Sequence, residues 1–299
     1  MTQMTTAAPR TAVDWRTLAA VAVTVLAWAS AFVAIRSAGS DFTAGALALG
    51  RMLVATVAVL GLLLARGEGL PQRAAWPGIV VSGLLWFGLY MVALNWAEQR
   101  VDAGTAAMLI GIGPILIALL GAWLLREGLP GPLLTGLAVS FAGAVLVGYS
   151  QSAGGDAPVL GVLACLVAAV GYATAVVAQK RALRHGSVLQ VTAFGSLVAT
   201  VGLLPFAGQL FDGLRHAPAG ATGNVLYLGL VPTALAFTTW NYALARRPAG
   251  RMGATTYAVP ALVVAMSWLL LGELPGWLTV LGGLLSLAGV AVARRGPRR

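Results

Sequence analysis

The sequence predicts an all-α membrane protein with about ten transmembrane helices, and three observations support this class. Of its 299 residues, 59% are hydrophobic and only 9% are charged, whereas about a quarter of a soluble domain is usually charged. The apolar residues form unbroken runs that reach the length of about 20 residues needed to cross a bilayer as a helix. These runs do not alternate apolar with polar residues, as the strands of a membrane β-barrel do.

The apolar runs follow one another along the chain with short connections between them. No connection is long enough for a soluble domain, so the sequence predicts a single membrane domain over residues 1–299. The first run lacks a clear signal-peptidase site, and we expect it to be retained as the first helix. The expected spans are residues 17–37, 43–65, 75–97, 104–125, 130–149, 158–179, 188–208, 222–245, 252–272 and 275–293.

Basic residues mark one side of the expected topology. About fifteen lysines and arginines fall on the side of both termini, three fall on the other side, and Arg51 lies inside a span. By the positive-inside rule, both termini face the cytoplasm of a bacterial inner membrane. Because the bases are dispersed between spans, the net charge of +10 does not indicate nucleic acid as a partner. The acids of the opposite side are Asp41, Glu98, Asp102, Asp156, Asp212 and Glu273.

The second half of the sequence repeats the first. A shift of about 146 residues lays residues 83–147 on 229–293 without a gap, and an earlier stretch matches at a shift of about 144. Each copy holds five expected spans, and because five is odd the second copy enters the membrane from the opposite side. Two inverted copies are the architecture of alternating-access transporters, which hold their substrate between the repeats. The two copies are residues 17–149 and 158–293.

The repeated segments share a stretch of small residues, a proline within a span, a glutamate after leucines at its end, and glycines in the next span. These features are residues 103–107, Pro114, 124–127, Gly136 and 142–143 in the first copy, and Pro260, 271–273, Gly282 and Gly289 in the second. The doubled motif resembles the EamA repeat of the drug/metabolite transporter superfamily, and the chain is most similar to its YddG-type aromatic amino-acid exporters. The resemblance implies a ten-helix basket. Its cavity would be lined mainly by the first, third, fourth, sixth, eighth and ninth helices, with the fifth and tenth at the periphery.

The sequence predicts no catalytic residue, no metal site and no cofactor. His185 and His216 fall in expected loops on opposite faces, and no expected span carries an acid near its middle. A metal site, a Ser–His–Asp triad or a carboxylate pair needs groups that this chain does not place together. Ionisable groups within a membrane mark proton and ion relays. Their near absence favours a neutral or zwitterionic cargo that moves down its gradient, or coupling through a group that the sequence does not reveal.

Aromatic side chains near the middle of the spans are the candidate substrate-binding residues. Trp28 and Tyr172 are equivalent in the two copies, and Trp86 and Tyr90 share one face of the third helix. Such a wall stacks on an aromatic side chain and still releases it. Packing between helices is the alternative interpretation. The expected substrate-binding residues are Trp28, Trp86, Tyr90, Met108, Tyr172 and Tyr257.

Four further residues repeat between the copies. Pro114 and Pro260 lie within equivalent spans, where they should kink the helix, and we expect them to act as hinges for the change of access. Asn95 and Asn241 lie near the ends of equivalent spans. We expect these amides to make polar contacts between helices, with a hydrogen bond to substrate as the alternative.

Charged residues within the spans and at their ends allow two interpretations each. Arg51 either binds a substrate carboxylate or snorkels to the outer interface to pair with Asp41 or a loop carbonyl. We favour snorkelling, because the repeat places Gly195 at the equivalent position and the second helix is not expected to line the cavity. Glu127 and Glu273 end equivalent spans, and we expect them to cap the following helices, with gating as the alternative.

Together these patterns predict an inner-membrane carrier that is not an enzyme. Its expected task is the export of small amphiphilic metabolites by alternating access, with aromatic or other hydrophobic amino acids as the first choice. Non-aromatic amino acids, drug-like cations and nucleosides are alternative cargoes, and a membrane scaffold is the alternative class. The expected partners are the small-molecule substrate and membrane lipid. The sequence does not set the oligomeric state, and a monomer is compatible with it.

Overall fold

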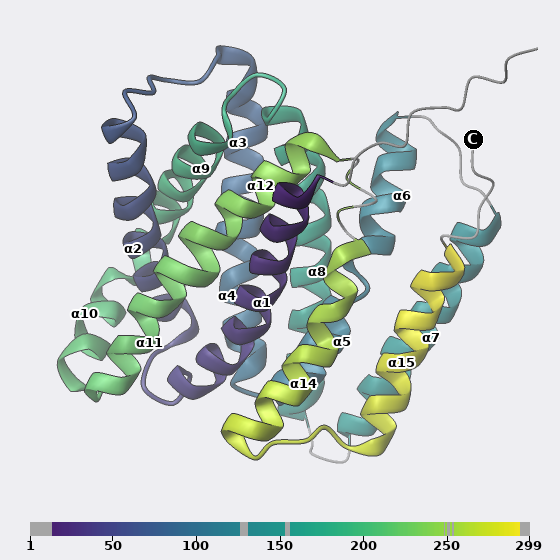
Figure 1. Ribbon diagram of the computed structural model, residues 1–299. Coiled ribbons are helices and arrows are strands. Elements are labelled where there is room, and N and C mark those ends of the chain that lie inside the picture. Colours follow the sequence, from purple (N-terminus) through teal and green to yellow (C-terminus); the bar gives the residue numbers. More distant parts are fainter. Residues whose placement is uncertain are drawn as a thin grey trace, which may run out of the picture.

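The computed structural model describes residues 14–125, 131–152, 156–247, 249, 252 and 254–293, which form helices and contain no strand (Figure 1). Within this part of the chain, six helical segments are long and apolar enough to cross a membrane, and four shorter helices are also apolar. The long segments are Trp15–Ala38, Ala44–Ala65, Arg73–Glu98, Pro158–Ala182, Val188–His216 and Ala219–Arg246. The shorter ones are Ala103–Ile117, Ala138–Val147, Ala258–Leu271 and Trp277–Gly289.

The elements of the first half run as far as residue 152. They are α1 (Trp15–Ala38), α2 (Ala44–Ala65), η1 (Arg73–Ala75), α3 (Trp76–Ser82), η2 (Gly83–Tyr90), α4 (Met91–Glu98), α5 (Ala103–Ile110), α6 (Gly113–Leu125) and α7 (Gly131–Ser152). Those of the second half are α8 (Asp156–Ala182), α9 (Val188–Leu203), η3 (Leu204–Phe206), α10 (Ala207–His216), α11 (Ala219–Gly229), η4 (Leu230–Leu235), α12 (Ala236–Arg246), η5 (Ala254–Tyr257), α14 (Ala258–Leu271) and α15 (Trp277–Ala293).

Polar side chains begin the helices that follow the tightest connections. Thr43 precedes α2 and accepts a hydrogen bond from the backbone N–H of Ala46 at 3.2 Å. Asp102 precedes α5 and accepts from the N–H of Thr105 at 2.8 Å. Ser187 begins α9 with a capping box. Each cap satisfies a backbone donor that the first helical turn leaves without a partner.

The seventh expected span is longer than the sequence predicts. Helix continues from α9 through η3 and α10 to His216, so the prediction that His216 lies in a loop is wrong. The reason is the amphipathic pattern of α10, which buries Leu210 against α2 and leaves polar residues exposed. Gly213 of α10 lies directly against the ring of Phe42, so the helix lies close to the start of α2.

Two segments within the bundle are π-helical. They are η2, in the third helical segment, and η4, about 146 residues later in the eighth. A π-helical turn bonds residue i to i−5 and is wider than an α-turn, and such turns often occur at functional sites. In η4, Pro232 has no N–H to donate, which helps to explain the departure from α-helix there. The segment η2 buries the rings of Trp86 and Phe87, whereas η4 buries the smaller Pro232, Thr233 and Ala234.

The α-helix is also interrupted near each of the two repeated prolines. Helix α5 ends at Ile110, and α6 begins at Gly113 with Pro114 as its second residue. Pro260 is the third residue of α14, directly after the 3₁₀ turn η5. In both places the irregular backbone lies before the proline, because the proline ring conflicts with helical backbone on its N-terminal side.

Helices α7 and α15 lie side by side at one edge of the bundle (Figure 1). Glycines allow the close approach, since a Cβ on Gly143 would meet the backbone of Gly282 and Ser286. The Ser140 hydroxyl donates to the carbonyl of Ser286 at 2.7 Å, and the Ser286 hydroxyl donates to the carbonyl of Ser140 at 3.0 Å. Small residues and side-chain hydrogen bonds therefore hold this pair together, as is usual in membranes.

Candidate functional site

A cavity of about 60 Å³ lies at the centre of the bundle. Its walls come from α1, α2, η2, α4, α5, α8, α12, η5 and α14. These elements belong to the helical segments that the family resemblance implies for the cavity, with α2 added. The lining residues are Trp28, Ala31, Phe32, Ile35, Arg51, Trp86, Tyr90, Met91, Leu94, Ala107, Ile110, Gly111, Tyr172, Phe237, Thr256, Val259 and Pro260.

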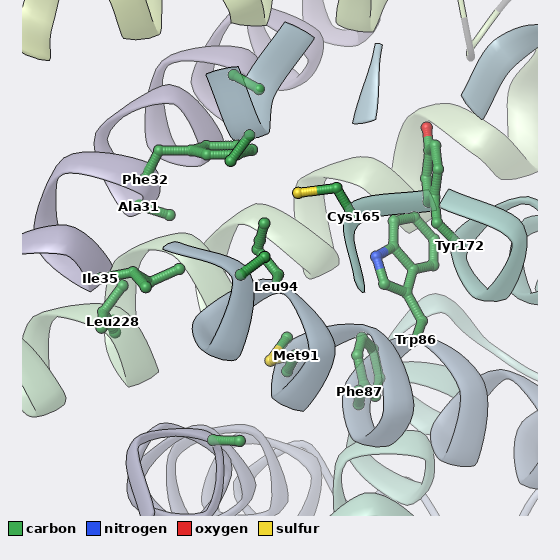
Figure 2. Close-up of a cluster of buried hydrophobic side chains, with 14 of the residues drawn as sticks. Ala31, Phe32, Ile35, Trp86, Phe87, Met91, Leu94, Cys165, Tyr172 and Leu228 are labelled. Atoms are coloured by element: carbon green, nitrogen blue, oxygen red, sulfur yellow. The ribbon is translucent and has the colours of Figure 1, made fainter. Parts of the chain in front are cut away.

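Trp86 is the centre of an aromatic cluster on the cavity wall. It is 2% exposed, and its ring centroid lies 5.6 Å from that of Trp28 and 4.8 Å from that of Tyr172. Phe237 of the second half packs edge-on against it at 4.8 Å. Figure 2 shows Trp86 beside Tyr172, with Phe87 on the same helix. The cluster thus joins rings from both halves of the chain around the cavity.

The π-helical segment η2 positions this cluster. Trp86 and Tyr90 both belong to η2, and both line the cavity. One turn further, Met91 and Leu94 of α4 extend the same wall opposite Phe32 of α1 (Figure 2). The result is an apolar surface built mainly from aromatic rings, of the kind that usually forms small-molecule sites.

Arg51 is the single charged residue of the lining, and the structure corrects its expected position. It is 3% exposed, so the prediction that it snorkels to the membrane surface is wrong. Its Nε and Nη2 donate to the Thr233 hydroxyl at 3.2 and 3.1 Å, and that hydroxyl donates to the carbonyl of Leu228 at 2.7 Å. Gly229 allows this contact, since a Cβ there would lie 2.9 Å from the Arg51 carbonyl oxygen. The close approach of η4 therefore holds the guanidinium inside the bundle.

Most of the predicted aromatic residues come together, and Met108 does not join them. Trp28, Trp86, Tyr90 and Tyr172 line the cavity. Met108 lies outside its lining, because its side chain packs against Gly283 of α15, where a Cβ would collide with its sulfur.

The remaining predicted residues occupy other positions. Pro260 lines the cavity, and Pro114 is buried in α6. The amide of Asn95 donates to the carbonyl of Ala44 at 3.0 Å, and that of Asn241 donates to the Thr192 hydroxyl at 2.8 Å. Both asparagines therefore join neighbouring helices. Tyr257 ends η5, but its side chain lies outside the described part of the chain, as does all of Glu127.

The sequence prediction missed other residues of the lining. Phe32 follows Trp28 by four positions, so the helical period alone could have revealed it. No helical spacing in the sequence links Phe237 or Thr256 to the predicted residues, and only the tertiary packing of the second half places them in the lining. For Arg51 the signal was present, since a lone arginine in an apolar span is costly and usually functional.

One end of the bundle is closed by charged contacts between distant segments. The Nε of Arg36, near the end of α1, lies 3.0 Å from an Oε of Glu273, which follows α14. Glu273 thus pairs with another segment, whereas helix capping was expected. The Nη1 of Arg36 also donates to the backbone carbonyl of Glu98 at 2.8 Å. Glu98 ends α4 and is buried, one residue beyond the end of the third expected span at residue 97.

The repeat-equivalent lysine makes a similar contact at the end of α8. Lys180 corresponds to Arg36, and its Nζ donates to the backbone carbonyl of Leu244. Leu244 in turn corresponds to Glu98 under the shift of about 146 residues. Nζ also donates to the carbonyl of Arg247 at 3.0 Å. Each half of the chain therefore carries a cation near the end of a long helix. Arg36 of α1 binds a backbone carbonyl of α4, and Lys180 of α8 binds one of α12.

The profile of one protein family, the EamA-like transporter family, matches residues 15–149 and again residues 159–295. The chain belongs to the EamA-like transporter family. This EamA-like protein is accordingly a multi-pass membrane transporter.

Individual relatives of this EamA-like transporter have similar lengths. The "Probable terminal-alkyne amino-acid exporter" of Streptantibioticus cattleyicolor is 38% identical, with 92% of each chain covered. The "Uncharacterized transporter YdfC" of Bacillus subtilis is 31% identical, with 88% of this chain and 86% of the relative covered. A protein of known crystal structure shares the fold, with a TM-score of 0.65 at 24% identity and coverage of 94% of this chain and 96% of the other.

Proposed function

We propose that this EamA-like transporter exports neutral amino acids with hydrophobic side chains from the cytoplasm, aromatic ones first. The observation that carries the proposal is the cavity that combines an aromatic wall with one buried guanidinium, that of Arg51. A guanidinium binds a carboxylate through paired N–H donors. Aromatic rings bind an apolar side chain through area and ring geometry. An amino acid presents both groups on one small molecule.

The two binding elements lie on different parts of the cavity wall. Arg51 comes from α2, whereas Trp86 and Tyr90 come from η2 and Tyr172 from α8. A cargo that spans the cavity would place its carboxylate at Arg51 and its side chain among the rings. The same arrangement disfavours the drug-like cations considered above, because a buried arginine repels a positive charge.

The cavity is smaller than the cargo that we propose for it. A volume of about 60 Å³ holds a few water molecules, whereas ligand pockets usually measure roughly 300 Å³ or more. Cargo therefore enters only when the walls move apart, which fits a closed stage of an alternating-access cycle. Pro114 and Pro260, beside the breaks before α6 and α14, are the hinges we propose for that movement.

The proposal includes ten spans in two inverted repeats, residues 17–149 and 158–293, with both termini in the cytoplasm. Repeat-equivalent residues meet each other, which supports a two-fold axis: Ser140 bonds Ser286 reciprocally, and the Thr56 and Thr200 hydroxyls lie 2.8 Å apart. The equivalent π-helical segments η2 and η4 also support it. The dispersed bases support the cytoplasmic termini by the positive-inside rule.

The name of the Streptantibioticus cattleyicolor relative supports amino-acid cargo. A terminal alkyne makes an amino-acid side chain apolar and unsaturated, so it suits the same ring-lined wall as an aromatic side chain. We therefore include short unsaturated amino acids such as L-propargylglycine in the proposed cargo class.

Counterflow in proteoliposomes tests this function. Vesicles with the purified protein are loaded with unlabelled L-phenylalanine, and uptake of labelled L-phenylalanine is measured against vesicles without protein. We expect transient accumulation that L-tryptophan and L-propargylglycine inhibit and that L-lysine and uridine do not. Accumulation no greater than in empty vesicles, with every one of these compounds, would contradict the proposal.

Two tyrosine variants test the aromatic wall in the same assay. Tyr90→Ala and Tyr172→Ala each remove a ring from the lining, and a lost ring contact is worth about 0.5–1.5 kcal/mol. We expect the half-saturating concentration of L-phenylalanine to rise about threefold to tenfold. Tyr149→Ala removes an exposed ring of α7 and is the matched control. Unchanged transport in both cavity variants would remove these rings from the site.

A further inference from the structure

The carboxyl group of Glu98 is buried without a hydrogen-bond donor. The residue is 1% exposed, and neither carboxylate oxygen has a hydrogen-bond partner among the described residues. Two acids nearby differ from it, because Asp102 accepts from Thr105 at its helix cap and Glu273 pairs with Arg36. An ionised carboxylate is costly inside a protein unless it is paired. The Glu98 carboxyl therefore needs either a proton or a cation to neutralise it.

The cations near Glu98 are bound to other groups. Arg36 approaches from α1, but it binds the Glu273 carboxylate and, on Glu98 itself, only the backbone carbonyl. Arg51 approaches from α2, but its hydrogen bonds go to Thr233. Glu98 interacts electrostatically with the titratable groups around it, which are Arg36, Arg51, Tyr90, Asp102, Glu273 and, from α8, Cys165.

Glu98 lies between the cavity and the closed end of the bundle. Met91 and Leu94 of α4 line the cavity, and both project from one helix in Figure 2. Glu98 follows Leu94 by four positions, so it lies one turn further along the same helix face. Its backbone carbonyl binds Arg36, which forms the ion pair with Glu273. A change in the charge of this carboxyl group therefore affects both the cavity and the contact that joins α1 to the segment after α14.

We propose that Glu98 is a proton-binding site that couples proton movement to cargo movement. The inference rests on the proposed function, because it names the ion that drives export. An O–H bond forms at Glu98 when a proton enters from the outer side, and it breaks when that proton leaves to water on the cytoplasmic side. While the carboxylate is charged, Arg36 or Arg51 neutralises it by leaving its present partner. Glu98 is thus the coupling group that the sequence alone did not reveal.

The proposed exchange links the proton to the change of access. Arg36 now directs its Nε to the Glu273 carboxylate and its Nη1 to the Glu98 backbone carbonyl. A shift of the guanidinium toward the Glu98 carboxylate draws it away from Glu273 and weakens the contact between α1 and the segment after α14. Loss of the Glu98 proton therefore favours opening of that end, and uptake of a proton there favours closure. One proton in for one amino acid out follows as the simplest cycle, which is the direction that a bacterial proton gradient drives.

Proton flux in proteoliposomes tests the coupling. Vesicles contain a pH-sensitive dye and L-phenylalanine, and the internal pH is recorded as the amino acid leaves. We expect the wild type to show proton uptake that depends on L-phenylalanine. In Glu98→Gln, whatever L-phenylalanine movement remains should carry at least tenfold less proton flux per amino acid than in the wild type. Glu68→Gln, at a partly exposed acid after α2, is the matched control and should keep the wild-type proton flux. The proposal would be overturned if Glu98→Gln kept the full proton flux. It would also be overturned if the wild type moved L-phenylalanine without any proton flux.

Infrared spectroscopy tests proton binding without any transport. A pH titration of the detergent-solubilised protein should show the C=O stretch of a protonated carboxylic acid, absent in Glu98→Gln and present in Glu68→Gln. Glu98→Asp keeps a carboxyl group and should restore the band with a shifted midpoint, which separates this effect from misfolding. A titrating Glu98 band together with absent counterflow would reject the proposed cargo and retain the proton site. No band that depends on Glu98 at any pH would reject the proton site itself.

Discussion

Arg51 occupies a position where a positive charge is costly. An arginine at the centre of a span costs about 2.5–3.5 kcal/mol on insertion scales. Among the described residues, its side chain donates to the Thr233 hydroxyl and to no carboxylate. A hydroxyl holds the guanidinium in place but does not neutralise it, so the charge remains available to an anionic group in the cavity. At the scale of single residues, we therefore propose that this side chain selects the cargo of the cavity.

Replacing Arg51 tests this role directly. Arg51→Gln removes the charge, and hydrogen bonds to charged groups are worth about 1.5–3 kcal/mol. We expect the half-saturating concentration of L-phenylalanine to rise at least tenfold in counterflow. Arg51→Lys keeps the charge without the paired donors, so its half-saturating concentration should lie between those of the wild type and Arg51→Gln. Arg66→Gln, at the exposed end of the same helix, is the control. Wild-type affinity in Arg51→Gln would show that the guanidinium serves packing alone.

The sequence predicted the aromatic lining of the cavity better than it predicted the position of the charged residue, Arg51. Trp28 and Tyr172 stand out because they are equivalent in the repeat, and Trp86 and Tyr90 because they share a helix face. The lone arginine in an apolar span was a signal that Arg51 has a function, but its burial depends on the close approach of α11 to α2 at Gly229, which is a tertiary contact. The burial of Glu98 depends likewise on tertiary packing.

At the scale of elements, the regular helices were predictable and the irregular ones were not. Thr43, Asp102 and Ser187 mark helix starts by their capping chemistry, so the expected starts lie close to the observed ones. The π-helical segments η2 and η4 have no comparable sequence signal. Pro232 removes a backbone donor in η4, whereas η2 contains no proline and buries the rings of Trp86 and Phe87.

The contact between α7 and α15 provides a prediction at the same scale. In Gly143→Ala the new methyl group meets the carbonyl oxygen of Gly282 and the backbone of Ser286, which cannot rotate away as a side chain would. Overpacking of this kind costs about 1–3 kcal/mol. We expect thermal unfolding in detergent to occur several degrees lower than in the wild type. Gly61→Ala, where a Cβ meets nothing within 4 Å, is the matched control. Equal melting of both variants would show that the pair separates at little cost.

At the scale of the whole molecule, the dispersed bases predict which connections face outwards. Ser40 and His185 are both exposed, on opposite sides of the proposed topology. We expect a membrane-impermeant maleimide to label Ser40→Cys on intact cells and to label His185→Cys only after lysis. The natural Cys165 is buried and provides the background. The reverse labelling pattern would place both termini outside.

The bond between Arg51 and Thr233 also bears on how the chain is made, because it joins residues 182 positions apart. Synthesis proceeds from the N-terminus, so α2 enters the bilayer long before its acceptor exists. Until the second half arrives, the guanidinium must find water or lipid headgroups, and the early intermediate stays loosely assembled. Ribosomal stalling or truncation before residue 233 would therefore leave an unstable half-carrier, a ready substrate for the proteases that survey the membrane.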